Sequence, residues 1–264
     1  MAILEQAIEA FKEQTKREYI AVHTNPCADM TVYQSKLGGV PYLPAGAAYP
    51  HSKLHPEQPL ELLIQINFAE MPHLEDFPTQ GILQIFINPA DDRYFGCDSQ
   101  IKHFAHLTLE NQSEYRIIYH EAVGESAPIP EIPCGCLIEQ TAQLIFEKKI
   151  GYMPYQTGSH EDFDEAFMAV YNQFADEEAF YPEDIEGCEL ALEKHFMTRA
   201  GHKIGGYQDD IWDAKWMRTE VLLLQIASDG CITWGDDGIA HFAISRADLQ
   251  KRDFSRVKYT WECY

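Results

Sequence analysis

Residues 62–66 read LLIQI and residues 222–226 read LLLQI, so a glutamine stands at the same place in two apolar segments. A short, continuous apolar run is typical of a strand that is buried on both faces. A buried side-chain amide needs hydrogen-bond partners, because an unpaired one costs about 1–3 kcal/mol. We therefore expect Gln65 and Gln225 to be structural, and to bond neighbouring backbone across an axis that relates the two segments.

Two further blocks accompany these strands in the same order. In the first half LGGVP (37–41) precedes the glutamine strand and GILQIFI (81–87) follows it; in the second half IGGYQ (204–208) precedes it and GIAHFAI (238–244) follows it. Ordered recurrence of three blocks predicts internal duplication of a β unit. Each Gly-Gly pair offers a backbone position that can take a positive φ or approach another chain closely; the four glycines are Gly38, Gly39, Gly205 and Gly206.

The remaining pattern favours a mainly β fold, a roll- or barrel-like antiparallel sheet with peripheral helices. Short strand-like segments alternate with Pro, Gly and Asp clusters, which is typical of such sheets. We predict one domain over residues 1–264, with an N-terminal helix at 2–17, a first repeat half at about 30–146, a helical insertion at about 159–198 and a second half at about 202–264.

Four local predictions complete this picture. Residues 30–33 and 231–234 have the composition of short strands. The prolines of residues 38–59 indicate a long structured loop. The helix at about 161–174 carries a stripe of aromatic residues, which is typical of a helix that docks onto a sheet.

The charge of the chain restricts its partners. Forty-two Asp and Glu against 20 Lys and Arg give a net charge of −22. Binding to nucleic acid or to anionic lipid normally needs clustered Lys and Arg, so we expect neither. The same field attracts a basic protein, although acidity for solubility alone is the simpler interpretation. We found neither a signal peptide nor a membrane span in the sequence, and we expect a cytoplasmic protein. No particular oligomeric state is predicted.

Three segments near the C-terminus add a family resemblance. Residues 232–236 (ITWGD), 248–249 (DL) and 253–257 (DFSRV), with the repeated blocks, make the chain similar to the YwqG-like family of bacterial proteins over nearly its whole length. The resemblance implies a mainly β fold of roll-like character, without an agreed activity or established catalytic residues. Relatives in this family are associated with bacterial toxin loci, where small acidic immunity proteins neutralise basic toxins. The resemblance therefore implies a binding role.

The sequence contains no strong catalytic motif. It has no Gly-x-Ser-x-Gly elbow, no P-loop and no Gly-x-Gly-x-x-Gly. Cys134 and Cys136 are closer together than in a usual zinc knuckle, and His103 and His106 would lie on opposite faces of a strand. We expect no metal and no cofactor.

Acidic residues beside the second Gly-Gly pair and beside a later turn are the candidate binding residues. Asp and Gly suit tight turns, which is the structural interpretation. The functional hypothesis is an acidic and aromatic patch suited to a Lys- or Arg-rich partner, made by Asp209, Asp210, Trp212, Trp234, Asp236 and Asp237.

Three functions remain open at this point, and one of them is a structural component of an assembly. The first is a non-enzymatic binding module that engages a basic protein partner through its acidic surface. The alternative is an enzyme or small-ligand binder with its site in the cleft between the two halves, where the Pro-rich loop could act as a lid.

Overall fold

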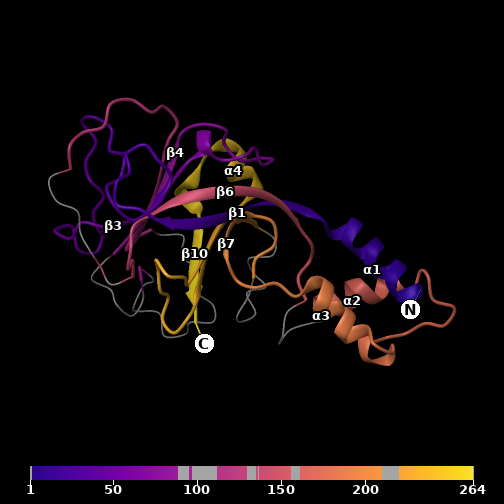
Figure 1. Cartoon of the computed structure of the whole chain (residues 1–264). Coiled ribbons are helices and arrows are strands. Elements are labelled where there is room, and N and C mark those ends of the chain that lie inside the picture. Colours follow the sequence, from indigo (N-terminus) through magenta and orange to yellow (C-terminus); the bar gives the residue numbers. More distant parts are fainter. Residues whose placement is uncertain are drawn as a thin grey trace.

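Ten strands form one antiparallel sheet in a computed structural model of the chain, which describes residues 2–88, 95–96, 112–129, 135, 137–155, 161–209 and 220–263. The strands are β1 (Arg17–Pro26), β2 (Lys36–Leu37), β3 (Glu61–Asn67), β4 (Ile82–Ile87), β5 (Tyr115–His120), β6 (Ala142–Gly151), β7 (His202–Gly205), β8 (Val221–Ala227), β9 (Ile239–Ile244) and β10 (Lys258–Glu262). The sheet curls into a half-barrel (Figure 1), which confirms the predicted fold class.

Four α-helices accompany the sheet in the described chain. They are α1 (Ala2–Thr15), α2 (Glu161–Tyr171), α3 (Cys188–Phe196) and α4 (Arg246–Lys251), with 3-10 turns η1 (Phe68–Glu70), η3 (Pro182–Asp184) and η5 (Phe254–Arg256). Helix α1 ends two residues earlier than predicted, because strand β1 already begins at Arg17. No helix among the described residues has the length and apolar character that a bilayer crossing requires.

The two longest strands lie at the centre of the sheet. Strands β1 and β6 pair over their full length, from Arg17 opposite Gly151 to Pro26 opposite Ala142. The other strands attach on either side, in the order β10-β9-β8-β7-β1-β6-β2-β3-β4-β5. Each central strand therefore begins one half of the sheet.

The two halves correspond strand by strand. From the centre outwards β7, β8 and β9 match β2, β3 and β4, which are the strands of the repeated blocks. The register of β3 against β4 shifts between Leu62 and Ile64, and that of β8 against β9 shifts between Leu222 and Leu224. The same irregularity thus falls at the same place in both glutamine strands. Duplication as the origin of these halves stays a prediction.

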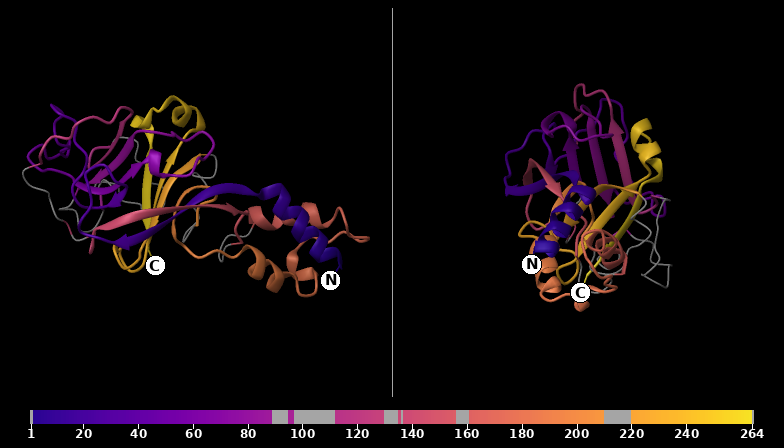
Figure 2. Two further views of the ribbon diagram at one scale, coloured as in Figure 1. Left: turned by 45° about the horizontal axis from the view of Figure 1, so that its top comes forward. Right: turned by 90° about the vertical axis from the view of Figure 1, so that its right-hand side faces the viewer.

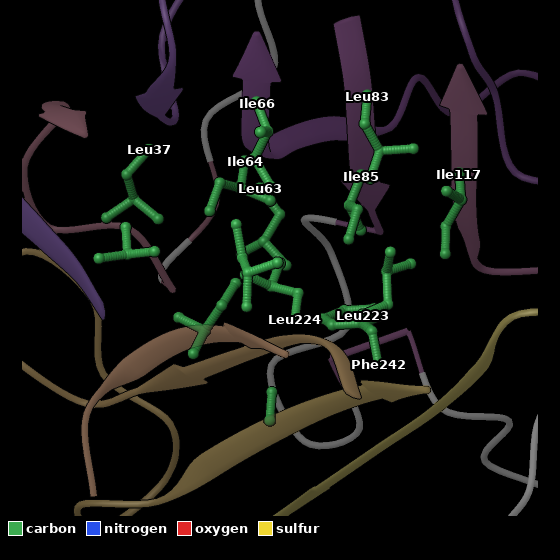
Figure 3. Packing of buried hydrophobic residues seen from close by; sticks show 14 of the residues in the cluster. Leu37, Leu63, Ile64, Ile66, Leu83, Ile85, Ile117, Leu223, Leu224 and Phe242 are labelled. Atoms are coloured by element: carbon green, nitrogen blue, oxygen red, sulfur yellow. The ribbon is translucent and has the colours of Figure 1, made fainter. Parts of the chain in front are cut away.

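The halves face each other across a common apolar core. Figure 3 shows side chains of Leu83, Ile85 and Ile117 pointing towards Leu223 and Phe242 from the opposite part of the curled sheet. Continuous burial along β4 and β9 explains why these segments are apolar apart from one polar residue each, Gln84 and His241.

Both Gly-Gly pairs have the positive φ that only glycine adopts easily. The φ angles are 64° and 75° at Gly38 and Gly39, and 72° at both Gly205 and Gly206. A Cβ on Gly205 would lie 2.7 Å from the side chain of Leu74. These positions therefore combine a left-handed turn with close packing.

Each buried glutamine ties the Gly-Gly turn of its own half to the sheet. The backbone N–H of Tyr42 donates to Oε1 of Gln65, and that of Asp209 donates to Oε1 of Gln225, both at 2.8 Å. The Gln65 amide also donates to the carbonyls of Val32 and Gln34. The prediction of a structural role is confirmed, but these bonds stay within one half, so the prediction of a bridge across the axis is wrong.

A second buried polar side chain completes each turn. Nε2 of Gln84 on β4 donates to the carbonyl of Tyr42 at 2.7 Å, and His241 on β9 stands at 3.0 Å from the carbonyl of Asp209. Because a carbonyl only accepts, the His241 Nε2 carries the proton. Burial lowers the pKa of His241 to about 4.

Neither of the two additional predicted strands forms. Residues 30–33 lie beside the sheet, where the carbonyls of Val32 and Tyr33 accept from the Gln65 and Asn67 side chains and not from a strand. In residues 231–234, Ile232 makes a single bridge with Ile138, because the Asp229 carboxylate caps this segment as a turn.

The aromatic stripe of α2 packs on helices, so the prediction of docking onto the sheet is wrong. A second hydrophobic cluster joins α1, α2 and α3, in which the Phe11 ring lies 5.1 Å from Phe163 and 5.4 Å from Phe167 and Phe196. The left view of Figure 2 shows these helices at one end of the long β1 and β6 strands, away from the curled sheet. We call α1, α2, α3 and the segment that joins α2 to α3 the helical lobe.

The buried histidine gives the fold a predicted acid sensitivity. The pKa of His241 lies below its ordinary 6.5, so the unfolded chain takes up the proton first, and stability is lost as the pH falls from 6.5 towards 4. At about pH 5 the loss amounts to about 2 kcal/mol. We expect His241→Gln, which copies Gln84, to remove most of this loss while changing the stability at about pH 7 by less than about 1.5 kcal/mol. Urea unfolding of the wild type and of His241→Gln at about pH 5 and about pH 7 measures this loss of stability.

His73→Gln, on an exposed histidine, is the matched control. An unchanged difference between the two pH values in His241→Gln would contradict the assignment of acid sensitivity to this residue.

Candidate functional site

Asp209, the first of the predicted binding residues, lies in the interior. Its carboxylate forms an ion pair with Lys203 at 2.6 Å and accepts from the Gln225 amide at 2.7 Å and from the Thr198 hydroxyl at 2.6 Å. Only 6% of the residue is exposed. The carboxylate is therefore used to hold the second Gly-Gly turn and is not presented to a partner, which corrects its predicted role.

The rest of the predicted patch is divided between core and surface. Trp234 is fully buried, with its ring centroid 5.6 Å from Phe95 and 6.2 Å from Trp261, so its predicted surface role is also corrected. Asp236 and Asp237 are exposed in the turn before β9, and Asp237 has a φ of 84°. Asp210 and Trp212 lie outside the described residues, as do Cys134, Cys136, His103 and His106. The patch therefore retains two described surface carboxylates.

A much stronger acidic surface lies on the helical lobe. Between residues 161 and 193 the chain has twelve Asp and Glu and no Lys or Arg. Carboxylates on the segment from α2 to α3 are exposed, among them Asp176, Glu177, Glu178, Glu183 and Glu186. This run of like charge is visible in the sequence, but it lies outside the repeated blocks beside which the candidate binding residues were predicted.

Large apolar side chains are exposed on the same segment. The exposed fraction is 68% for Phe180, 61% for Tyr181 and 72% for Leu190, and Phe174 is also exposed. Single exposed apolar residues are ordinary, but these four lie within one short segment of chain, beside a dense group of carboxylates. We call residues 174–190 the lobe tip.

Specific hydrogen bonds hold the lobe tip in shape. The Asn172 side chain bonds both backbone groups of Ala179, at 3.0 Å to its N–H and 2.8 Å to its carbonyl. The backbone N–H of Tyr181 donates to the Asp184 carboxylate at 3.2 Å, which caps η3, and η3 packs against α3. The exposed rings therefore stand on an ordered support, which reduces the conformational entropy lost on binding.

The tip suits a partner that is both basic and apolar. Opposite charges speed association and select the partner, while desolvated apolar and aromatic side chains supply most of the affinity. A purely acidic surface provides only the attraction between opposite charges. The lobe tip provides carboxylates and exposed apolar side chains within 17 residues of chain.

A pocket lies between the two halves of the sheet, at the position of the alternative hypothesis. Its volume is about 680 Å³, and its walls come from the loop after η1, the second Gly-Gly pair, the start of β8 and the end of β6. Asp76 in this wall has a φ of 68°, and its carboxylate bonds Arg246 and Gln250 of α4. Its described lining contains no residue of the Pro-rich loop at 38–59, so the predicted lid does not cover this pocket.

The described residues offer no metal centre. Among them no group of three or more His, Cys, Asp or Glu side chains is placed to hold an ion.

The comparisons with known proteins place the chain in a family without an assigned activity. A family model described as a domain of unknown function (DUF1963) matches residues 35–263, which is more than half of the chain. The match includes the sheet from β2 onwards, α2 and α3. The search of curated proteins finds no match.

The exposure of the tip predicts which substitutions the fold tolerates. We expect Phe180→Ser and Leu190→Ser to change the free energy of unfolding by less than about 0.5 kcal/mol, because these side chains contribute little to packing. Phe167→Ala, in the buried cluster beneath, should cost about 3–5 kcal/mol. Urea unfolding of the three variants measures this. A cost above about 2 kcal/mol for either serine variant would show that the tip side chains are buried in solution.

Proposed function

The chain belongs to the DUF1963 family, and we propose that it is a non-enzymatic binding protein whose lobe tip takes a basic, partly apolar segment of a partner protein. The observation that carries the proposal is the coincidence of exposed aromatic and aliphatic side chains with a run of twelve carboxylates that contains no Lys or Arg. The partner segment that fits is rich in Lys or Arg and presents at least one large apolar side chain.

The architecture supports this role. The apolar faces of α1, α2 and α3 are used inside the lobe, so the exposed tip residues are not required by that cluster. Most of the charge repulsion within the tip is carried by exposed groups, where water and salt screen it. A bound basic segment would relieve the repulsion that remains.

The proposal includes the kind of binding protein. The YwqG-like resemblance supports an immunity-like role, in which an acidic cytoplasmic protein neutralises a basic one. The net charge of −22 favours a basic protein over nucleic acid or a membrane as partner.

Binding of a defined probe tests the tip. The probe is a labelled helical peptide of lysine and leucine, and a second peptide with glutamate in place of lysine is its control. Fluorescence anisotropy at about 0.02 M and about 0.3 M salt should show binding of the lysine peptide alone, weaker at the higher salt. We expect Glu178→Lys to weaken binding about threefold at low salt. Phe180→Ser should weaken binding about tenfold at both salt concentrations.

Asp29→Lys is the matched control, because it makes the same charge change on an exposed carboxylate outside the lobe. Equal loss in Asp29→Lys and Glu178→Lys would mean that the peptide senses only the net charge. Wild-type binding by Phe180→Ser would remove the tip from the site.

A small-ligand site between the halves is the second candidate, supported by the 680 Å³ pocket that both halves line. Val221 at the start of β8 lines this pocket, and Val221→Phe should fill part of it. In a thermal-shift screen of small polar compounds, a true ligand should stabilise the wild type and bind Val221→Phe about tenfold more weakly. Val123→Phe, on an exposed loop residue, should bind it normally. A screen without a stabilising compound, or one whose effect survives Val221→Phe, would contradict this candidate.

A further inference from the structure

The two outer edges of the half-barrel approach each other at a seam. Strand β5 ends one half and β10 ends the other, yet the rings of Tyr115 and Tyr259 lie 5.1 Å apart and the Tyr115 hydroxyl donates to the carbonyl of Val257 at 3.1 Å. The Gln112 amide donates to the carbonyls of Phe254 and Ser255 in η5, at 2.9 and 3.1 Å. Side chains of the first half therefore hold the second half at this seam.

A pocket of about 380 Å³ opens at the seam, and basic residues line it. We call it the seam pocket; its described lining is Lys53, Gln112, Arg116, Ile117, Ile118, Tyr119, Arg252, Phe254 and Ser255. Three of these residues are cations, and none of the described lining residues is acidic. In a chain with 42 Asp and Glu against 20 Lys and Arg, this is a local reversal of the charge balance.

The cations come from three separate segments. Lys53 belongs to the Pro-rich loop, whose backbone is tied to the start of β5 by the bond from the Lys53 N–H to the Ser113 carbonyl at 2.9 Å. Arg116 lies on β5, and Arg252 is the C-cap that follows α4 in the second half. The tertiary fold alone brings them together, because Arg116 and Arg252 are 136 positions apart in the chain.

Each guanidinium is oriented by protein groups and keeps further donors. Nη2 of Arg116 donates to the His51 carbonyl at 2.9 Å, while Arg252 bonds the Tyr119 hydroxyl and reaches the Leu249 carbonyl at 3.4 Å. A guanidinium has five N–H donors, so these bonds leave several for a ligand. Burial, and then the nearby positive charge of Arg116, lower the pKa of Lys53, which shows that like charges interact here.

Two of the lining residues also have an unfavourable backbone conformation. The φ angles of Gln112 and Arg252 are 46° and 62°, in the left-handed region that non-glycine residues seldom adopt. Such conformations persist where the surrounding structure holds them, and they concentrate at binding sites. The carboxylate of Asp253, which follows Arg252, is occupied by bonds to the N–H and hydroxyl of Ser255, and the negative charges of Glu114 and Glu121 act on Arg116 and Tyr119.

We propose that the seam pocket is a binding site for the phosphate group of a small phosphorylated molecule. Two guanidinium groups match the geometry of a phosphate, and the Lys53 ammonium adds a third positive charge. Ile117 and Phe254 offer an apolar wall to the remainder of the molecule, whereas the Tyr119 and Ser255 hydroxyls already donate to the Gln80 carbonyl and to the Asp253 carboxylate. A carboxylate carries one negative charge and would leave more of the positive charge uncompensated. The site is separate from the lobe tip, so neither proposal depends on the other.

Titration with inorganic phosphate and with glycerol phosphate tests the proposal. In isothermal titration calorimetry the wild type should bind both compounds, with the dissociation constant for each below about 10 mM. Arg116→Gln and Arg252→Gln should each raise this constant about tenfold or more, because each removes a charge-assisted pair. Arg199→Gln, an equal charge change on an exposed residue beside the lobe, should leave it unchanged.

One further variant and one further ligand test whether binding depends on the geometry of the site as well as on its charge. Arg116→Lys retains the charge and loses the two-pronged geometry, so its binding should fall between that of the wild type and Arg116→Gln. Acetate, which carries a single carboxylate, should bind at least tenfold more weakly than phosphate. Absence of phosphate binding to the wild type, wild-type affinity in both glutamine variants, or equal affinity for acetate would each overturn the proposal.

Discussion

The full-length pairing of β1 with β6 is the constraint on which the rest of the structure depends. From Arg17 opposite Gly151 to Pro26 opposite Ala142, the two strands hold each other at the centre of the sheet. One half of the half-barrel builds outwards from β1 and the other from β6. At the opposite end of the same ladder the chain passes into the helical lobe (Figure 2). A change of register here would shift both halves and the lobe together, because side chains alternate between faces along a strand.

The polar interior shows how similar halves come to differ. Both use a glutamine to hold a Gly-Gly turn, with a lysine beside it; Lys36 in the first half is buried and Lys203 in the second is partly buried. Lys203 pairs with the Asp209 carboxylate, whereas Lys36 donates to the carbonyls of Thr31 and Val40. Burial accordingly lowers the pKa of Lys36 to about 8. In the second half an ion pair therefore joins the turn to the lysine, and the Asp209 carboxylate in this pair is buried.

Charge is distributed unevenly over the molecule, and the fold accounts for this. The helical lobe packs its apolar faces internally, so its outer positions are free to carry carboxylates and exposed rings. The seam between the sheet edges instead gathers cations from three segments. The two proposed sites, for a basic partner at the lobe tip and for a small anion at the seam, are therefore compatible in one strongly acidic chain, because each attraction acts mainly within about a Debye length of 10 Å.

The local sequence pattern determined the secondary-structure elements. The tertiary structure decided which residues of these elements contact one another. The apolar runs at 62–66 and 222–226, the glycine pairs and the glutamines predicted buried strands and left-handed turns, because these depend on the chemistry of a few adjacent residues. The acidic run of residues 161–193 is also visible in the sequence. The sequence could not show that Asp209 and Trp234 are buried, since that depends on Lys203 and Phe95, which approach them only after folding. It could not predict the seam pocket either, because Arg116 and Arg252 meet through the curl of the sheet, which is a property of all ten described strands together.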